Sequence, residues 1–97
     1  MYGTVARMVV KESELPGIEE KFRQIGVGTA RGQLGVYVYQ MDRDSREFFF
    51  AVMFESEEAY RSNATSPEQG QRFAQLAAML EGEPEWNDGH IIFSLTA

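Results

Sequence analysis

The sequence predicts an α+β fold of the ferredoxin-like type, in which a four-stranded antiparallel sheet carries its helices on one face. Apolar runs of strand length alternate with segments of helical spacing, in the order strand, helix, strand, strand, helix, strand. In the run at residues 47–54, both alternating rows of side chains are apolar. An antiparallel strand with one wet face would alternate apolar with polar residues, so both faces of this sheet need cover.

The composition limits both the size of the fold and its partners. A chain of 97 residues with 43% apolar content predicts one globular domain over residues 1–97. The net charge is −6 and the nine Lys and Arg residues are scattered, which argues against nucleic acid and anionic membrane surfaces as partners. The lack of cysteine excludes disulfides and thiolate chemistry, and it is compatible with a cytoplasmic location. The N-terminal apolar run is too short for a signal peptide or a membrane span.

The first two predicted elements are a strand and an amphipathic helix. Residues 2–10 read as a strand whose two rows are both mostly apolar. Ser13 and Glu14 mark a helix start, with Pro16 tolerated in the first turn, and Gly26 is the expected C-cap. Apolar residues at spacings of three and four form the core stripe of this helix: Leu15, Ile18, Phe22 and Ile25.

A hairpin is predicted after the helix. The glycines of residues 26–35 do not follow the G-x-G-x-x-G pattern and come after a helix, so this stretch reads as a plain connection and not as a phosphate loop. Residues 34–41 and 47–54 are strands, and residues 42–45 between them have turn composition.

Two helices and a last strand complete the prediction. Ser56 caps a short helix that runs through Asn63. Ser66 at the N-cap, Pro67 at the first helical position and Gln69 three residues after the cap mark the start of a longer helix. Its predicted apolar stripe is Phe73, Leu76, Ala77 and Leu80, and Gly70 inside it costs roughly 1 kcal/mol relative to alanine. Residues 81–89 read as a solvated acidic loop, and residues 90–96 as the last strand.

The strand pattern also predicts an assembly. The helices of one chain cover one face of a four-stranded sheet, yet large apolar groups from at least three strands lie on the other. Left in water, that face would expose a larger apolar area than the apolar patches of typical soluble monomers. We therefore expect a homodimer in which two sheets pack face to face; the alternative is a monomer with a half-exposed sheet.

Three polar residues are candidates for catalysis. His90, the only histidine, is a possible base or single ligand or, alternatively, a solvated side chain at a strand end. Without cysteine it cannot build a zinc site of the usual kind. Asn63 is suited either to donate a hydrogen bond to a substrate oxygen or to end a helix. Arg7 lies in an apolar strand, so it needs a substrate anion or a structural acidic partner.

Four aromatic residues are candidates for ligand binding. Tyr37 and Tyr39 share a strand face, Tyr60 follows the third strand, and Trp86 lies in the acidic loop. They suit a pocket for a flat aromatic ligand, and packing in the core or in a dimer interface is the alternative. Trp86 is expected to cover a pocket mouth or to dock on the partner subunit.

The segment after the third strand resembles a known superfamily. Phe54, Glu55 and Ser56 lead into a short helix that carries Tyr60 and Asn63, and Ser66-Pro67 then opens the next helix. By this pattern the chain resembles the dimeric α+β barrel superfamily, in particular the antibiotic-biosynthesis-monooxygenase-like proteins. There, the third strand ends in an aromatic residue followed by an acidic or polar pair. The likeness in element order covers nearly the whole chain.

The resemblance implies a homodimer with an aromatic-lined pocket between sheet and helices. It implies cofactor-independent monooxygenation of an electron-rich aromatic such as a quinol, with Asn63, Arg7 and His90 orienting or deprotonating the substrate. No cofactor and no metal are expected. Quinol-oxidising relatives usually carry a His in place of Asn63, and haem-degrading ones carry a Trp there and an Asn near Arg7. A non-catalytic ligand-binding or structural dimer and a haem-binding protein are the alternatives.

Overall fold

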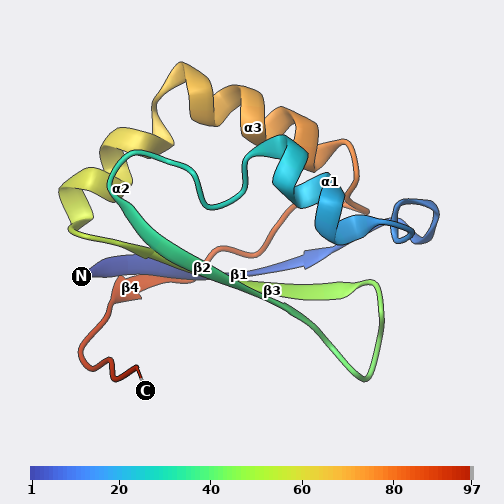
Figure 1. Cartoon of the computed structure of the whole chain (residues 1–97), viewed down its shortest axis with the longest axis horizontal. Helices are drawn as coiled ribbons and strands as arrows, with labels where there is room; N and C mark the ends of the chain where they lie inside the picture. The colour runs from blue at the N-terminus through green and yellow to red at the C-terminus, as the bar shows by residue number, and fades with distance from the viewer. Residues whose placement is uncertain (97) are drawn as a thin grey trace.

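Four strands form one antiparallel sheet in the order β2-β3-β1-β4, as the computed structural model of residues 1–96 shows (Figure 1). The strands are β1 at Tyr2–Val9, β2 at Gln33–Gln40, β3 at Glu47–Phe54 and β4 at Asp88–His90. β3 pairs along its length with both β1 and β2, so the strand that is apolar in both rows is central. The predicted α+β, ferredoxin-like fold is confirmed.

All three α-helices lie on one face of the sheet (Figure 1). They are α1 at Ile18–Ile25, α2 at Glu57–Ala64 and α3 at Pro67–Ala77. The two predicted serine caps are confirmed. Ser56 Oγ accepts a hydrogen bond from the Ala59 amide at 3.0 Å, and Ser66 Oγ accepts one from the Gln69 amide at 3.1 Å. Within residues 1–96, no helix is long and apolar enough to span a bilayer.

One row of each central strand builds the core beneath the helices. On β3 this row includes Phe48 and Phe50, which make edge contacts with Phe22 of α1 at ring-centroid distances of 5.7 and 5.3 Å. On β1 the row includes Ala6 and Met8, both buried. The core is completed by Val10, Leu76, Met79 and Leu80.

The other face of the sheet has no cover among the described residues. Odd-numbered positions of β1 and β3 point to this face, which carries Val5, Phe49, Ala51 and Met53. Tyr37 pairs with Ala51, so the outward tyrosines of β2 lie on the same side. We call this surface the open sheet face. Figure 1 shows the C-terminal segment leaving the sheet on this side, and no helix there.

The predicted start of the first helix is wrong. Residues Glu12–Glu14 form a 3₁₀ turn instead, closed by a bond from the Leu15 amide to the Glu12 carbonyl. Gly17 then takes a left-handed conformation with φ of 70°, which breaks any continuous helix, so α1 begins at Ile18. The predicted end at Gly26 is confirmed, with φ of 90° at the cap.

The predicted last strand is present, but its predicted bounds, residues 90–96, are wrong. β4 pairs with β1 only from Asp88 opposite Thr4 to His90 opposite Tyr2. β4 runs antiparallel to β1, so past His90 it reaches the N-terminus, and the last bond joins the Ile91 amide to the Met1 carbonyl. Beyond it Ile92, Phe93 and Leu95 lie outside the sheet and are almost fully exposed.

Candidate functional site

A cavity of about 450 Å³ lies between the helical face of the sheet and helices α2 and α3. Its size is within the range of small-molecule sites, about 300–1,000 Å³. The wall formed by the sheet is mostly apolar, and its largest side chains come from the inward row of β3, where Phe50, Val52 and Phe54 lie. Phe73 and Leu76 of α3 form the facing wall. An apolar, aromatic chamber of this kind suits a flat hydrophobic ligand.

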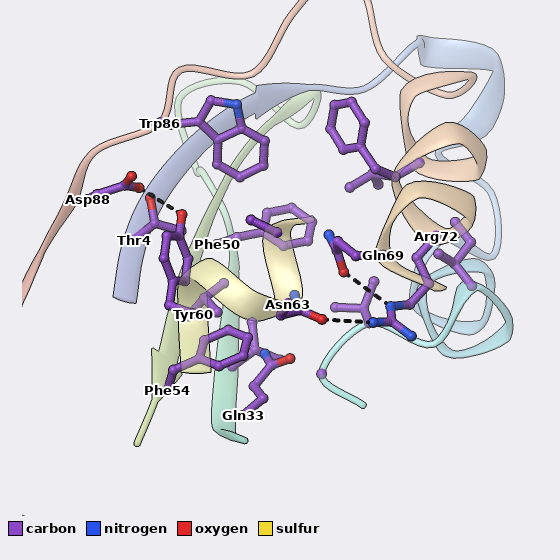
Figure 2. A pocket seen from close by; sticks show the side chains of 18 of the residues that line it. Thr4, Gln33, Phe50, Phe54, Tyr60, Asn63, Gln69, Arg72, Trp86 and Asp88 are labelled. Carbon is purple, nitrogen blue, oxygen red and sulfur yellow. Dashed lines mark hydrogen bonds between the residues drawn. The ribbon is translucent and has the colours of Figure 1, made fainter. Parts of the chain in front are cut away.

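Trp86 lines the cavity at one edge (Figure 2). It comes from the segment before β4, and its ring packs on Phe73 at 5.9 Å between centroids. Half of the Trp86 side chain is exposed, so one face meets solvent and the other meets the cavity. The structure thus places Trp86 in the cavity lining, and its role in covering a pocket mouth stays a prediction.

One polar group lines the cavity where α2 meets β4. The Tyr60 hydroxyl donates a hydrogen bond to Asp88 Oδ1 at 2.8 Å. Burial, and then the hydrogen bond to Asp88, raise the pKa of Tyr60 to about 12, so the phenol stays protonated at neutral pH. Asp88 also faces the Arg61 guanidinium at 3.5 Å. It is the only carboxylate among the described residues that line the cavity.

A second polar group lies on the other side of the cavity, at the junction of α2 and α3 (Figure 2). The Arg72 guanidinium donates to Asn63 Oδ1 at 3.2 Å through Nη2 and to Gln69 Oε1 at 3.2 Å through Nε. Both amides use their oxygens in these bonds. Within residues 1–96, neither amide NH₂ group donates a hydrogen bond.

The position of Gly70 in the cavity lining accounts for a glycine inside α3. It lines the chamber one residue after Gln69, and a Cβ added to it would meet no heavy atom within 4 Å. The backbone there is not left-handed, so no conformational reason demands glycine. The absent side chain leaves open space in the cavity.

A polar depression of about 770 Å³ adjoins the cavity. Asn63 and Arg72 line both spaces, so the two meet at this pair. The depression carries the acidic residues Glu55, Glu58 and Glu68. None of them forms an ion pair with Arg72 within the described chain.

The structure brings together three of the seven residues predicted for the site: Asn63, Tyr60 and Trp86 all line the cavity. Tyr37 and Tyr39 do not. They belong to the opposite row of β2, point to the open sheet face and are more than half exposed. Tyr60 is therefore separated from the other two tyrosines by the sheet itself.

Arg7 and His90 also lie outside the cavity. Arg7 is on the open sheet face, where it contacts Glu47 at 2.5 Å and Glu85 at 2.9 Å. The structural acidic pairing considered for Arg7 is thus confirmed. The His90 ring packs edge-on against the Tyr2 ring, with 4.8 Å between the ring centroids, and most of the His90 side chain is exposed.

The sequence patterns missed Asp88, Gln69 and Arg72. The sequence pattern predicts a solvated loop at Asp88, and only the pairing of Asp88 opposite Thr4 brings it to Tyr60. The sequence pattern indicates only a capping role for Gln69 and no role for Arg72. A helical spacing of three between them, with Gly70 on the same side, was the available signal. No group of three or more potential metal ligands occurs within residues 1–96.

Fold and cavity define a small α+β protein that holds an aromatic-lined chamber between one sheet and its helices. The family described as "Antibiotic biosynthesis monooxygenase" matches residues 1–75. The chain belongs to this family.

Solved structures share the fold at low identity. A candidate antibiotic biosynthesis monooxygenase from Nitrosomonas europaea has a TM-score of 0.76 at 13% identity, covering 96% of this chain and 100% of that one. One from Bordetella bronchiseptica has a TM-score of 0.79 at 14% identity, covering 95% and 97%. A conserved protein from Methanosarcina mazei Go1 has a TM-score of 0.75 at 18% identity, covering 91% and 89%. At these identities the likeness shows the fold alone. No curated protein sequence matches the chain.

Proposed function

We propose that the protein is a homodimeric, cofactor-independent monooxygenase that oxidises an electron-rich aromatic such as a quinol. The observation that carries this proposal is the cavity of about 450 Å³, apolar along the sheet and α3 and polar at two points. Family membership supports the reaction class. A flat two-ring aromatic suits the space between Phe50, Phe73 and Trp86.

The proposed reaction balances without an added cofactor. A quinol and O₂ give a hydroxyquinone and water. One oxygen atom enters a ring C–H bond and forms C–OH. The other oxygen leaves as water with the two hydrogens of the quinol hydroxyls. The substrate supplies all four electrons, two from its conversion to the quinone and two from hydroxylation of the ring.

Each polar group of the cavity has its own role in the proposed reaction. Asp88 accepts a proton from a substrate hydroxyl, because it is the cavity's carboxylate and proton removal makes the ring more electron-rich. Tyr60, held neutral by burial and by Asp88, donates a hydrogen bond and fixes the carboxylate. Asn63 orients a substrate oxygen through its amide.

The open sheet face supports the homodimer. Val5, Tyr37 and Tyr39 are about half exposed or more, and Phe49 and Met53 are only partly covered. The exposed apolar side chains of residues 91–96 extend this surface. A second copy with its sheet packed on this face buries these groups. Light scattering at micromolar concentration tests it: twice the chain mass of 11.0 kDa is expected, and a monomer refutes the dimer.

An isotope experiment tests the oxygenation. The protein is incubated with 1,4-naphthalenediol under ¹⁸O₂, and the product is analysed by mass spectrometry. Monooxygenation gives a hydroxynaphthoquinone with one ¹⁸O atom. Unlabelled naphthoquinone at the rate of the protein-free blank would overturn the proposal. Gly70→Phe is the matched control, because its ring occupies the open space of the cavity, and it is expected to abolish turnover.

A further inference from the structure

Arg72 is a cation of the cavity that has no carboxylate partner within residues 1–96. The other cavity arginine, Arg61, faces carboxylate oxygens of Asp88 and Glu57 at 3.5 Å each and donates to the Tyr2 hydroxyl at 2.9 Å. Arg72 contacts only neutral amides, Asn63 and Gln69. A guanidinium has five N–H donors, and these two bonds leave three of them without a hydrogen bond among residues 1–96.

The amides add donors at the same place. Arg72 takes the amide oxygens of Asn63 and Gln69, which leaves their NH₂ groups available. In Figure 2 these two amides and Arg72 gather on one side of the cavity, away from Tyr60 and Asp88. The chamber is therefore rich in donors at one end and holds its carboxylate at the other. A ligand that satisfies both ends carries an acceptor-rich group at the first and a hydroxyl at the second.

We propose that Arg72, Asn63 and Gln69 form a subsite for the carboxylate of an aromatic acid, whose ring occupies the apolar cavity. A planar carboxylate matches the fork of the guanidinium and forms charge-assisted bonds, which are stronger than bonds between neutral groups. This inference rests on the proposed function and names its substrate class, a hydroxyaromatic carboxylic acid.

The neighbouring depression fixes where the anion lies. Three carboxylates line that space, those of Glu55, Glu58 and Glu68, against one cation besides Arg72, which is Arg31, so the depression repels an anionic ligand more than the cavity does. The ligand's carboxylate consequently lies on the cavity side of Arg72. Its ring then extends toward Phe50 and Trp86, and a ring hydroxyl on the far side reaches Asp88.

Trp86 provides the measurement. It is the only tryptophan of the chain and lines the cavity, so its fluorescence reports a ring that enters. The wild type is titrated with 2-naphthoate and with 2-naphthamide, which differ in charge and share the ring system. The acid is expected to bind about tenfold more tightly than the amide. This factor corresponds to one charge-assisted hydrogen bond in place of a hydrogen bond between neutral groups. Equal affinities would overturn the subsite.

Variants separate the subsite from the cavity. In Arg72→Gln the preference for the acid is expected to vanish while the amide binds as in wild type, which also shows that the variant is folded. Arg72→Lys retains part of the preference because the charge remains. Arg23→Gln, on the exposed side of α1, removes the same charge from a residue that does not line the cavity, and it is expected to keep the preference. A preference that persists in Arg72→Gln overturns the proposal.

The same titration distinguishes failure of the carboxylate subsite from failure of the proposed function. If both naphthalenes bind equally, the cavity is a ligand site and only the carboxylate subsite fails. If neither changes Trp86 fluorescence at millimolar concentration, the cavity takes no aromatic ligand, and the proposed function fails together with the subsite.

Discussion

Gly70→Ala is a perturbation with opposite expected effects on stability and on binding. Gly70 lies in the first turns of α3, and its backbone has an ordinary helical conformation. A Cβ at this position meets no heavy atom within 4 Å, so it neither clashes nor gains packing. The change in stability therefore comes from helix propensity alone.

The difference in helix propensity between glycine and alanine gives the size of the expected change in stability. Glycine in a helix interior is about 1 kcal/mol less favourable than alanine, so Gly70→Ala is expected to stabilise the fold by about that amount. For a domain of this size, 1 kcal/mol raises Tm by roughly 4–8 °C. The assay is thermal unfolding followed by circular dichroism, at one protein concentration because a dimer's Tm depends on concentration.

The same helix offers a matched control. Ala74, one turn further along α3, is exposed, and Ala74→Gly is expected to lower stability by a similar amount. In the naphthoate titration, affinity is expected to fall stepwise from Gly70 to Ala to Phe as the cavity fills. A Gly70→Ala variant with a lower Tm than wild type would refute the expected gain from helix propensity. A variant that binds 2-naphthoate more tightly would refute the view that the missing side chain at residue 70 leaves space for a ligand.

Three further predictions concern other parts of the molecule. Hydrogen bonds from Arg43 and Arg7 lower the pKa of Glu47 from 4.5 to about 2, so its stabilising effect is complete above pH 4.5 and is lost as pH falls toward 2. In urea unfolding, Glu47→Gln is therefore expected to be less stable than wild type at pH 7, with a gap that narrows by pH 3. Tyr37→Asp places a charge on the open sheet face and is expected to halve the mass in light scattering; an unchanged dimer counts against this interface. Asp88→Asn is expected to lower turnover of 1,4-naphthalenediol by about 10²–10⁴-fold, and retention of full activity would remove Asp88 as the proton acceptor.

Local patterns predicted most of the fold. The bounds of β3 are the predicted ones, because a run of eight strand-forming residues between a turn and a serine cap leaves little choice. The caps of α2 and α3 were predictable for the same reason, since Ser56 and Ser66 satisfy amides three residues away. These features depend on neighbours in the sequence.

One error comes from long-range strand pairing and the other from a turn that the apolar spacing hides. Residues 91–96 have strand composition, yet a strand needs a partner, and β1 starts at Tyr2. The start of α1 depends on the left-handed turn at Gly17, which the helical spacing of Leu15 and Ile18 conceals.

The site was predictable only in part. Asn63 and Tyr60 belong to a short helix next to the third strand, so their proximity is local. Tyr37 and Tyr39 could be placed on one row of a strand, but the row alone does not say which face the helices cover. Asp88 reaches the cavity only through the pairing of β4 with β1, 84 positions away from Thr4, and no local pattern encodes that contact.

The two faces of the sheet are linked through β3. Phe50, Val52 and Phe54 line the cavity, and the residues between them, Ala51 and Met53, lie on the open sheet face. Successive residues of a strand share one rigid backbone, so a partner sheet packed on Ala51 and Met53 also fixes the cavity wall. A variant that dissociates the proposed dimer is therefore expected to weaken ring binding at Trp86 even though no altered residue touches the cavity. Unchanged 2-naphthoate affinity in a monomeric variant would show that each subunit builds its site alone.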